Sequence, residues 1–285
     1  MIPELNIIRP SGLEEALDSL AQGGVRVIAG GTDMIPSLRK LREADFDLMD
    51  ISQLRELRFI KEEDGRIRAG TLTTFSDILY SELLSFRGGL LQRSVKNSGT
   101  RQIRNRATLG GNITNASPAA DTVPALCALD AEVVLVSSSG ERRLPLAGFI
   151  TGPYTTAARP QELVREILFS PLPGGSGYSF IKLARREASA ISRVNVAAVL
   201  KVVSGVIEYA AVSAGSVSPG PGRIPEAEDI LVGGRPSREL FTRAAEGAVA
   251  AVIEKSGVRW STPYKEPVMK ALMSRVFEES CGSRL

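Results

Sequence analysis

The 285-residue sequence contains no histidine and only two cysteines, Cys127 and Cys281. Without histidine the chain cannot form a Ser-His-Asp or Cys-His catalytic group, and it has no imidazole to bind zinc or iron. Two cysteines so far apart in the sequence cannot hold an iron–sulfur cluster. We therefore expect no catalytic side chain and no metal site in this chain, and any redox chemistry has to come from a bound cofactor.

Aromatic residues and excess charge are also scarce. The chain has one Trp and five Tyr, and its formal net charge is only +3, with Lys and Arg spread evenly. The chain therefore offers few aromatic surfaces on which bases could stack and no basic patch for phosphates, so we do not expect nucleic acid as a partner. No run approaches the roughly 18 apolar residues of a membrane span, and the first residues do not resemble a secretory signal. We expect a cytoplasmic protein whose cysteines stay reduced, with Cys127 in the core.

The remaining composition, 43% apolar and 24% charged, is that of an ordinary globular protein. The length exceeds the roughly 100 to 200 residues of a typical domain, so we expect two domains. Residues 171–177 (Pro-Leu-Pro-Gly-Gly-Ser-Gly) interrupt regular structure and resemble a linker. The boundary is therefore placed there, giving domains 1–173 and 178–285, and the first domain divides into subdomains of about 1–57 and 58–173.

Apolar periodicity predicts a mixture of helices and strands. The strands predicted from apolar runs are 25–28, 48–51, 131–136, 141–144 and 163–169 in the first domain, and 178–184, 194–203 and 206–214 in the second. A hairpin over 59–67 should close at Asp64-Gly65. Helices are expected after a capping box at 11–14, within 74–97 with a break at Gly88-Gly89, and from about Ser237 and Pro263.

Two glycine-rich turns are the strongest functional signal. The strand 25–28 leads directly into 29–34 (Ala-Gly-Gly-Thr-Asp-Met), and a second turn contains Gly110-Gly111 within a polar stretch from Thr108 to Asp121. Glycine lets backbone N–H groups approach a diphosphate closely. Taken alone, the first turn is better explained as structural, whereas the polar second turn favours nucleotide binding. A loop that satisfies its own backbone would look similar.

In combination, these segments resemble the FAD-binding medium subunit of molybdenum hydroxylases, the family of the xanthine dehydrogenase and carbon monoxide dehydrogenase flavoproteins. The resemblance is carried by 29–34, 102–113, 116–121 and 180–186, and Tyr264 to Arg275 is similar to the closing helix of the family. It implies an α+β fold, with a PCMH-type FAD-binding domain of two subdomains followed by a smaller α+β C-terminal domain of the CO dehydrogenase flavoprotein type. FAD would lie extended in the cleft between the subdomains.

The resemblance also implies which residues bind FAD. They are Ile28, Ala29, Gly30, Gly31, Thr32, Asp33, Met34, Thr108, Gly110, Gly111, Asn112, Thr114, Asp121 and Lys182. Ile28 to Met34 would wrap the diphosphate, and the residues from Thr108 to Asn112 would meet it from the other side. Asp121 would accept hydrogen bonds from the ribose of the adenosine half, and Lys182 would lie near the diphosphate or the flavin ring. Some relatives place an aromatic residue against the adenine, but here that region holds Ser98.

The function implied by the resemblance is that of an FAD-carrying electron-transfer subunit of a molybdenum hydroxylase. Such a subunit accepts electrons from the [2Fe-2S] clusters of a small iron–sulfur subunit and passes them to NAD⁺ or another acceptor. A molybdopterin large subunit oxidises the organic substrate, and the assembly is a heterotrimer. Two alternatives stay open: a self-sufficient PCMH-type flavin oxidoreductase, which would need its own substrate pocket, and a flavin-free docking subunit.

Overall fold

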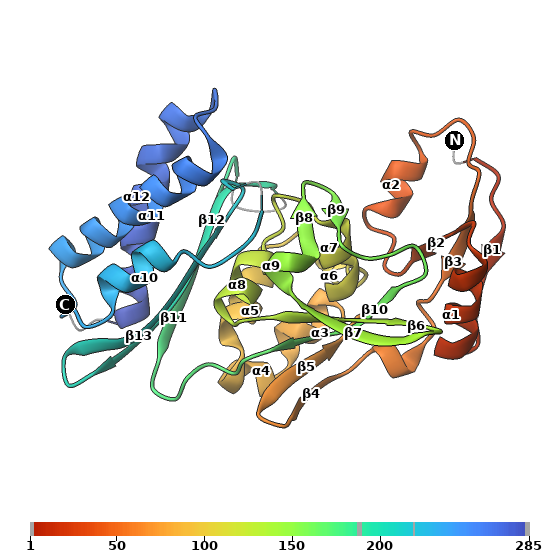
Figure 1. The fold of residues 1–285 in the computed structure, drawn as a ribbon, viewed down its shortest axis with the longest axis horizontal. Helices are drawn as coiled ribbons and strands as arrows, with labels where there is room; N and C mark the ends of the chain where they lie inside the picture. The colour runs from red at the N-terminus through yellow and green to blue at the C-terminus, as the bar shows by residue number, and fades with distance from the viewer. Residues whose placement is uncertain (1–2, 187–189, 219, 283–285) are drawn as a thin grey trace.

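The structure, a computed structural model, describes residues 3–186, 190–218 and 220–282 (Figure 1). The chain forms three groups of elements that follow one another along the long axis of the molecule, from the N-terminal group to the C-terminal helices (Figure 1). Helices and strands are mixed throughout, as predicted for the α+β class. No described helix has both the length and the apolar character required to cross a membrane.

The first group is a small parallel sheet. Its elements are β1 (Ile7–Ile8), α1 (Leu13–Gln22), β2 (Val25–Ile28), α2 (Met34–Leu38) and β3 (Asp47–Asp50). The strand order is β1-β3-β2, and both pairs are parallel. Parallel strands must be joined by crossover connections. Here α1 lies in the connection from β1 to β2, and α2 lies in the connection from β2 to β3. Leu20 and Met49 pack in the core of this group together with Val136 and Leu163 of the next sheet, so the two groups share apolar side chains.

The start of α1 differs from the predicted capping box. The N-cap is Gly12, which has no side chain to accept a hydrogen bond from the first turn. Instead, the backbone N–H and the hydroxyl of Ser11 both donate to Glu15, each at 2.7 Å. The prediction of a Ser11 cap was wrong because this serine donates to a carboxylate of the first turn rather than accepting from its backbone.

The second group is an antiparallel sheet covered by helices. After the 3-10 helix η1 (Arg55–Leu57), the strands are β4 (Ile60–Glu63), β5 (Arg66–Gly70), β6 (Glu132–Ser137), β7 (Gly140–Pro145) and β10 (Leu163–Phe169), in the order β4-β5-β10-β6-β7. The other elements are α3 (Phe75–Tyr80), α4 (Glu82–Arg87), α5 (Gly89–Val95), α6 (Arg101–Arg104), α7 (Leu109–Asn115), α8 (Thr122–Ala128), α9 (Leu146–Phe149), β8 (Ile150–Gly152) and β9 (Thr155–Thr156). The predicted hairpin closes through Asp64 and Gly65, whose φ values of 51° and 71° suit a tight turn.

The third group is a three-stranded antiparallel sheet buried on both faces. It contains β11 (Gly177–Ala184), β12 (Ser192–Val203), β13 (Val206–Gly215), α10 (Pro225–Leu231), α11 (Arg238–Ser256) and α12 (Thr262–Cys281). Val194 and Val196 pack with the C-terminal helices, whereas Ala197 and Val199 pack with the core of the second group. Successive residues of a strand face opposite sides, so β12 has to be apolar nearly throughout. The C-terminal sheet is thereby fixed to the preceding helices over an apolar interface.

Both cysteines are free thiols, and Cys127 is buried, as predicted. Burial raises the pKa of the Cys127 thiol to about 12. The thiolate is the reactive form of cysteine, so this residue is a core side chain without redox reactivity at neutral pH.

A buried carboxylate holds the central strand of the second sheet. Glu166 on β10 is fully buried and accepts hydrogen bonds from Arg68 at 2.7 Å and from Arg165 at 2.6 Å. Burial alone would raise the pKa of Glu166, but the hydrogen bonds from the two guanidinium groups outweigh it, and the pKa is lowered. A lowered pKa in the folded state means that the ionised form stabilises the fold above the unfolded value and that this stabilisation is lost as the pH falls.

We predict that Glu166→Gln lowers the free energy of unfolding by roughly 2 kcal/mol at pH 7, because charged hydrogen bonds are lost from a buried site. The deficit relative to the unaltered chain should shrink below the ordinary glutamate pKa of 4.5. Urea unfolding at pH 7 and at an acidic pH measures both. Glu62→Gln, which breaks a surface pair with Arg87, is the control and should change stability far less. A deficit that does not depend on pH would contradict the assignment.

Candidate functional site

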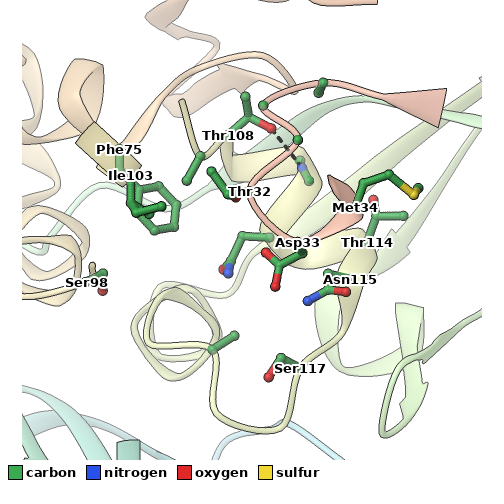
Figure 2. A pocket seen from close by; sticks show the side chains of 18 of the residues that line it. Thr32, Asp33, Met34, Phe75, Ser98, Ile103, Thr108, Thr114, Asn115 and Ser117 are labelled. Carbon is green, nitrogen blue, oxygen red and sulfur yellow. Dashed lines mark hydrogen bonds between the residues drawn. The ribbon is translucent and has the colours of Figure 1, made fainter. Parts of the chain in front are cut away.

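A cavity of about 1020 Å³ lies where the three groups of elements meet. Cofactor and small-molecule sites are typically roughly 300–1,000 Å³, so this cavity has room for a large cofactor. It is lined by the turn after β2, by the segment from Ser98 to Asp121, by the start of β10, and by Lys182 and Ser192 of the C-terminal sheet. Figure 2 shows this pocket with side chains of the first two groups around it.

All fourteen residues predicted to bind the cofactor line this one cavity, from Ile28 to Met34 on the first turn to Lys182 on β11. The fold therefore brings together residues that are widely separated in the sequence. Their individual contacts with a cofactor stay predictions. Among the described residues, no group of three or more Cys, Asp or Glu side chains is arranged to hold a metal ion.

The first turn presents unused backbone donors. Gly31 has a φ of 73°, a left-handed conformation that favours glycine, and its carbonyl accepts from Ile35 N at 3.0 Å as α2 begins. Within the described part of the chain, the N–H groups of residues 30–33 donate to no backbone carbonyl. Successive free N–H groups at a turn form a concave site that attracts anions. Residues 30–33 line the cavity, so this turn is suited to hold a diphosphate.

The first turn lies directly against the backbone that precedes the second. A Cβ atom placed on Gly30 would lie 1.9 Å from the carbonyl oxygen of Arg106. No side chain fits in that space, so glycine is required for the close approach of the two segments. The contact joins the first subdomain to the segment that leads into α7, and it turns two separate loops into two walls of one cavity.

The second turn satisfies most of its own backbone. The N–H of Gly110 donates to the Thr71 carbonyl at 3.0 Å, and the N–H of Gly111 donates to the Thr108 hydroxyl at 3.1 Å. A Cβ on Gly110 would lie 1.7 Å from the Thr71 hydroxyl, so packing explains this glycine. The two turns therefore differ in what they offer: the free backbone donors belong to the first turn, and the second supplies mainly side chains. Which of them binds a nucleotide stays a prediction.

Polar side chains of the second turn face the cavity. Thr108, Thr114, Asn115 and Ser117 line it and are drawn around the pocket in Figure 2. Asn112 also lines the cavity, and its Oδ1 accepts from the Thr122 hydroxyl at 2.5 Å, which fixes the orientation of its amide. Hydroxyl and amide groups can both donate and accept, so this wall suits the phosphate and sugar groups of a nucleotide.

Asp121 and Lys182 form a pair that the sequence did not predict. Lys182 Nζ lies 2.5 Å from Asp121 Oδ2, and both side chains are largely buried, at 12% and 7% exposure. The same oxygen accepts from the Ser98 hydroxyl at 2.9 Å, and Oδ1 accepts from Ser192 at 2.5 Å and Asn195 at 2.9 Å. Lys182 therefore lies at the Asp121 end of the cavity, in contact with the carboxylate predicted to bind the adenosine ribose.

Several lining residues were not predicted. Phe75 and Ile103 add apolar surface, and Tyr154 lines the cavity with 67% of its surface exposed. Tyr154 also has a φ of 59°, which is uncommon for a residue other than glycine. Its position after Gly152-Pro153 marks a turn in the sequence, but nothing in the sequence places that turn at the cavity.

The fold and the cavity together define a binding protein for an extended anionic cofactor, with backbone donors on one wall, hydroxyl and amide groups on another, and a carboxylate at one end. Residues 3–171 match the family model described as "FAD binding domain in molybdopterin dehydrogenase". Residues 179–280 match the model described as "CO dehydrogenase flavoprotein C-terminal domain". The chain thus belongs to the family of FAD-binding medium subunits of molybdenum hydroxylases.

Relatives match over nearly the full length. The glyceraldehyde dehydrogenase medium chain of Sulfolobus acidocaldarius is 33% identical, over 97% of this chain and 98% of that one. The nicotinate dehydrogenase FAD-subunit of Eubacterium barkeri is 30% identical, over 96% and 95%. Among solved structures, carbon monoxide dehydrogenase of Hydrogenophaga pseudoflava superimposes with a TM-score of 0.92 at 27% identity, covering 99% and 98% of the two chains. These matches confirm the predicted family and fold, and the relatives are oxidoreductase subunits.

We predict that Gly30→Ala abolishes most flavin retention, because the added methyl group cannot coexist with the Arg106 carbonyl and has to separate the two turns. Flavin content per chain after gel filtration is the measurement. Gly148→Ala is the control, since beyond its chain neighbours and its own helix no described atom lies within 4 Å of the added methyl group, and it should keep the full flavin content. Equal flavin content in both variants would show that the contact is not needed for the cavity.

Proposed function

We propose that this chain holds FAD in the cavity and transfers electrons between a partner subunit that carries [2Fe-2S] clusters and NAD⁺ or another acceptor. The observation that supports this most strongly is the row of unused N–H groups at residues 30–33 on the wall of a large cavity. An anion of two phosphates satisfies such donors, and the Thr32 hydroxyl adds another beside them. FAD, when bound, supplies the exchange of one or two electrons that the side chains of this chain cannot perform.

The residues of the chain bind and orient the cofactor in this proposal. Residues 30–33 hold the diphosphate, and the hydroxyl and amide groups from Thr108 to Ser117 complete its hydrogen bonds. The carboxylate of Asp121 accepts hydrogen bonds from the adenosine ribose, for which an acceptor without protons is suited. Phe75 and Ile103 provide apolar contact surface along the cavity. No side chain of the site is assigned an acid–base role.

The partners are proposed from the relatives. The glyceraldehyde and carbon monoxide dehydrogenase relatives are named medium chains, and the nicotinate dehydrogenase relative is named an FAD-subunit. We propose that this chain likewise assembles with a small iron–sulfur subunit and a large molybdopterin subunit that oxidises the organic substrate. The heterotrimer would work in the cytoplasm.

The two alternatives have less support. A self-sufficient oxidoreductase needs an acid or base held near its substrate. Both buried carboxylates of this cavity are paired, Asp121 with Lys182 and Glu162 with Arg142, and the third carboxylate, Asp33, is exposed. A flavin-free docking subunit has no use for backbone donors held open at residues 30–33. The electron-transfer subunit uses both features.

The visible spectrum of the purified chain, with identification of the released chromophore, tests the proposal. We expect one FAD per chain. A chain that takes up no flavin, even after incubation with FAD, would contradict the proposed cofactor site. In the assembled complex, reduction by the organic substrate followed by addition of NAD⁺ should restore the oxidised flavin spectrum if NAD⁺ is the acceptor. If only oxygen or a quinone restores it, the acceptor is not NAD⁺.

We predict that Asp121→Asn weakens FAD binding by roughly tenfold or more, because a charged acceptor for the ribose is lost. FMN has no adenosine half, and its affinity should not change. Dissociation constants of both flavins, measured by fluorescence quenching, give the comparison. An equal loss of affinity for FAD and FMN would move this carboxylate away from the adenosine.

A further inference from the structure

One residue of β12 breaks the apolar character of the strand. Asn195 stands between Val194 and Val196, and its side chain is fully buried. Its Nδ2 donates to Asp121 Oδ1 at 2.9 Å, whereas its Oδ1 has no hydrogen-bond partner among the described residues. Burying an amide oxygen without a partner costs free energy. Asn195 therefore costs folding free energy at this position of the strand. What it contributes in return is the hydrogen bond to Asp121.

The neighbouring strand is shaped to hold this amide. Gly215 of β13 pairs with Asn195 across the sheet. A Cβ atom on Gly215 would lie 2.3 Å from Asn195 Oδ1, so any larger residue would push the amide out of place. The direction in which Asn195 points is thus set by two strands of the C-terminal sheet, and it points at a residue of the N-terminal domain.

The carboxylate of Asp121 is saturated by side chains of both domains. Among the described residues, its four donors are Ser98, which follows α5, and Lys182, Ser192 and Asn195, which belong to the C-terminal sheet. An ionised carboxylate offers about four acceptor positions, so a ribose hydroxyl can bind to Asp121 only when one donor leaves.

Lys182 is the donor best able to leave. It lines the cavity, and its side chain is a flexible stem with three donors on a rotating head. Asn195 is fixed by Gly215, and Ser98 shares its one hydroxyl proton between Asp121 and the Ser94 carbonyl at 3.0 Å, within its own segment. Ser192 also lines the cavity, but its short side chain is held at the first residue of β12. Movement of Lys182 needs only a change of rotamer, whereas movement of Asn195 would disturb the sheet.

We infer that Ser192 and Asn195 are positioning residues for the cofactor: they hold Asp121 in the orientation that accepts the adenosine ribose of FAD, and Lys182 is the donor that the ribose displaces. The inference rests on the proposed FAD site. It gives the C-terminal sheet a part in cofactor binding, because three of the four contacts that described residues make with Asp121 come from it.

The test compares variants that remove a hydrogen bond to Asp121 with one that removes a similar bond elsewhere on the sheet. Asn195→Ala and Ser192→Ala should each raise the dissociation constant of FAD roughly tenfold and leave that of FMN unchanged. Ser179→Ala is the matched control, because Ser179 is a buried serine of β11 whose hydroxyl donates to Glu279 at 2.6 Å. It should leave both flavin affinities unchanged.

The possible failures are distinguishable. If the unaltered chain binds no FAD, the proposed cofactor site is wrong and the inference falls with it. If the unaltered chain binds FAD and the Asn195 and Ser192 variants bind it equally well, only the inference is wrong. If the Ser179 variant or the affinity for FMN is weakened to the same extent, the effect comes from general loosening of the sheet, which also overturns the role assigned to Asn195 and Ser192.

A crystal structure of the chain with FAD tests the part assigned to Lys182. We expect Lys182 Nζ to have moved beyond hydrogen-bond distance of Asp121 Oδ2, with the contacts from Ser98, Ser192 and Asn195 retained. A ribose bound at Asp121 with Lys182 still in place, and one of the other donors displaced, would overturn that assignment.

Discussion

The close contact between Gly30 and the carbonyl of Arg106 is the constraint on which the site depends. It exists only because the turn after β2 has no side chain at that position, and it holds a parallel subdomain against a helical segment far along the chain. Residues 30–33 can then present their N–H groups to the same cavity as the hydroxyl and amide groups of α7. Without this approach, the two loops would be ordinary surface turns on neighbouring subdomains.

A second constraint comes from the C-terminal sheet, which is buried on both faces. Alternate residues of β12 contact the C-terminal helices on one side and the core of the second group of elements on the other. An apolar interface of this kind makes a rigid junction rather than a hinge. Polar residues at the start of that strand, Ser192 and Asn195, are consequently held at a fixed place beside Asp121. The end of the cavity that receives the cofactor's adenosine in our proposal is thus built by the packing of the third group of elements on the second.

Much of the fold could be predicted from the sequence because strands with regular apolar patterns are specified locally. The strand predicted over 163–169 is β10, and the Asp64-Gly65 hairpin closes as expected. Short elements were harder to predict from the sequence. β8 and β9 contain too few residues to show an apolar pattern. The separate helix α4 begins at Ser81, whose hydroxyl accepts a hydrogen bond from the Leu84 N–H. The division into domains 1–173 and 178–285 stays a prediction.

The site was partly predictable for a different reason. The glycine turns and the segment containing Lys182 carry family motifs, and every residue chosen from them lines the cavity. What could not be predicted depends on contacts between distant segments. The hydrogen bond from Asn195 to Asp121 joins two residues that are far apart in the sequence, and nothing near Asn195 identifies Asp121 as its partner. Likewise, only the contacts with Thr71 reveal that packing accounts for Gly110.

Amide hydrogen exchange with and without FAD tests whether the first turn binds the diphosphate, because it reports which backbone donors acquire a partner. We expect fast exchange at residues 30–33 without the cofactor and marked protection with it. At Gly110 and Gly111, which are already hydrogen-bonded, FAD should change little by comparison. Protection of Gly110 and Gly111 on addition of FAD, with residues 30–33 still exchanging freely, would contradict the assignment of the diphosphate to the first turn.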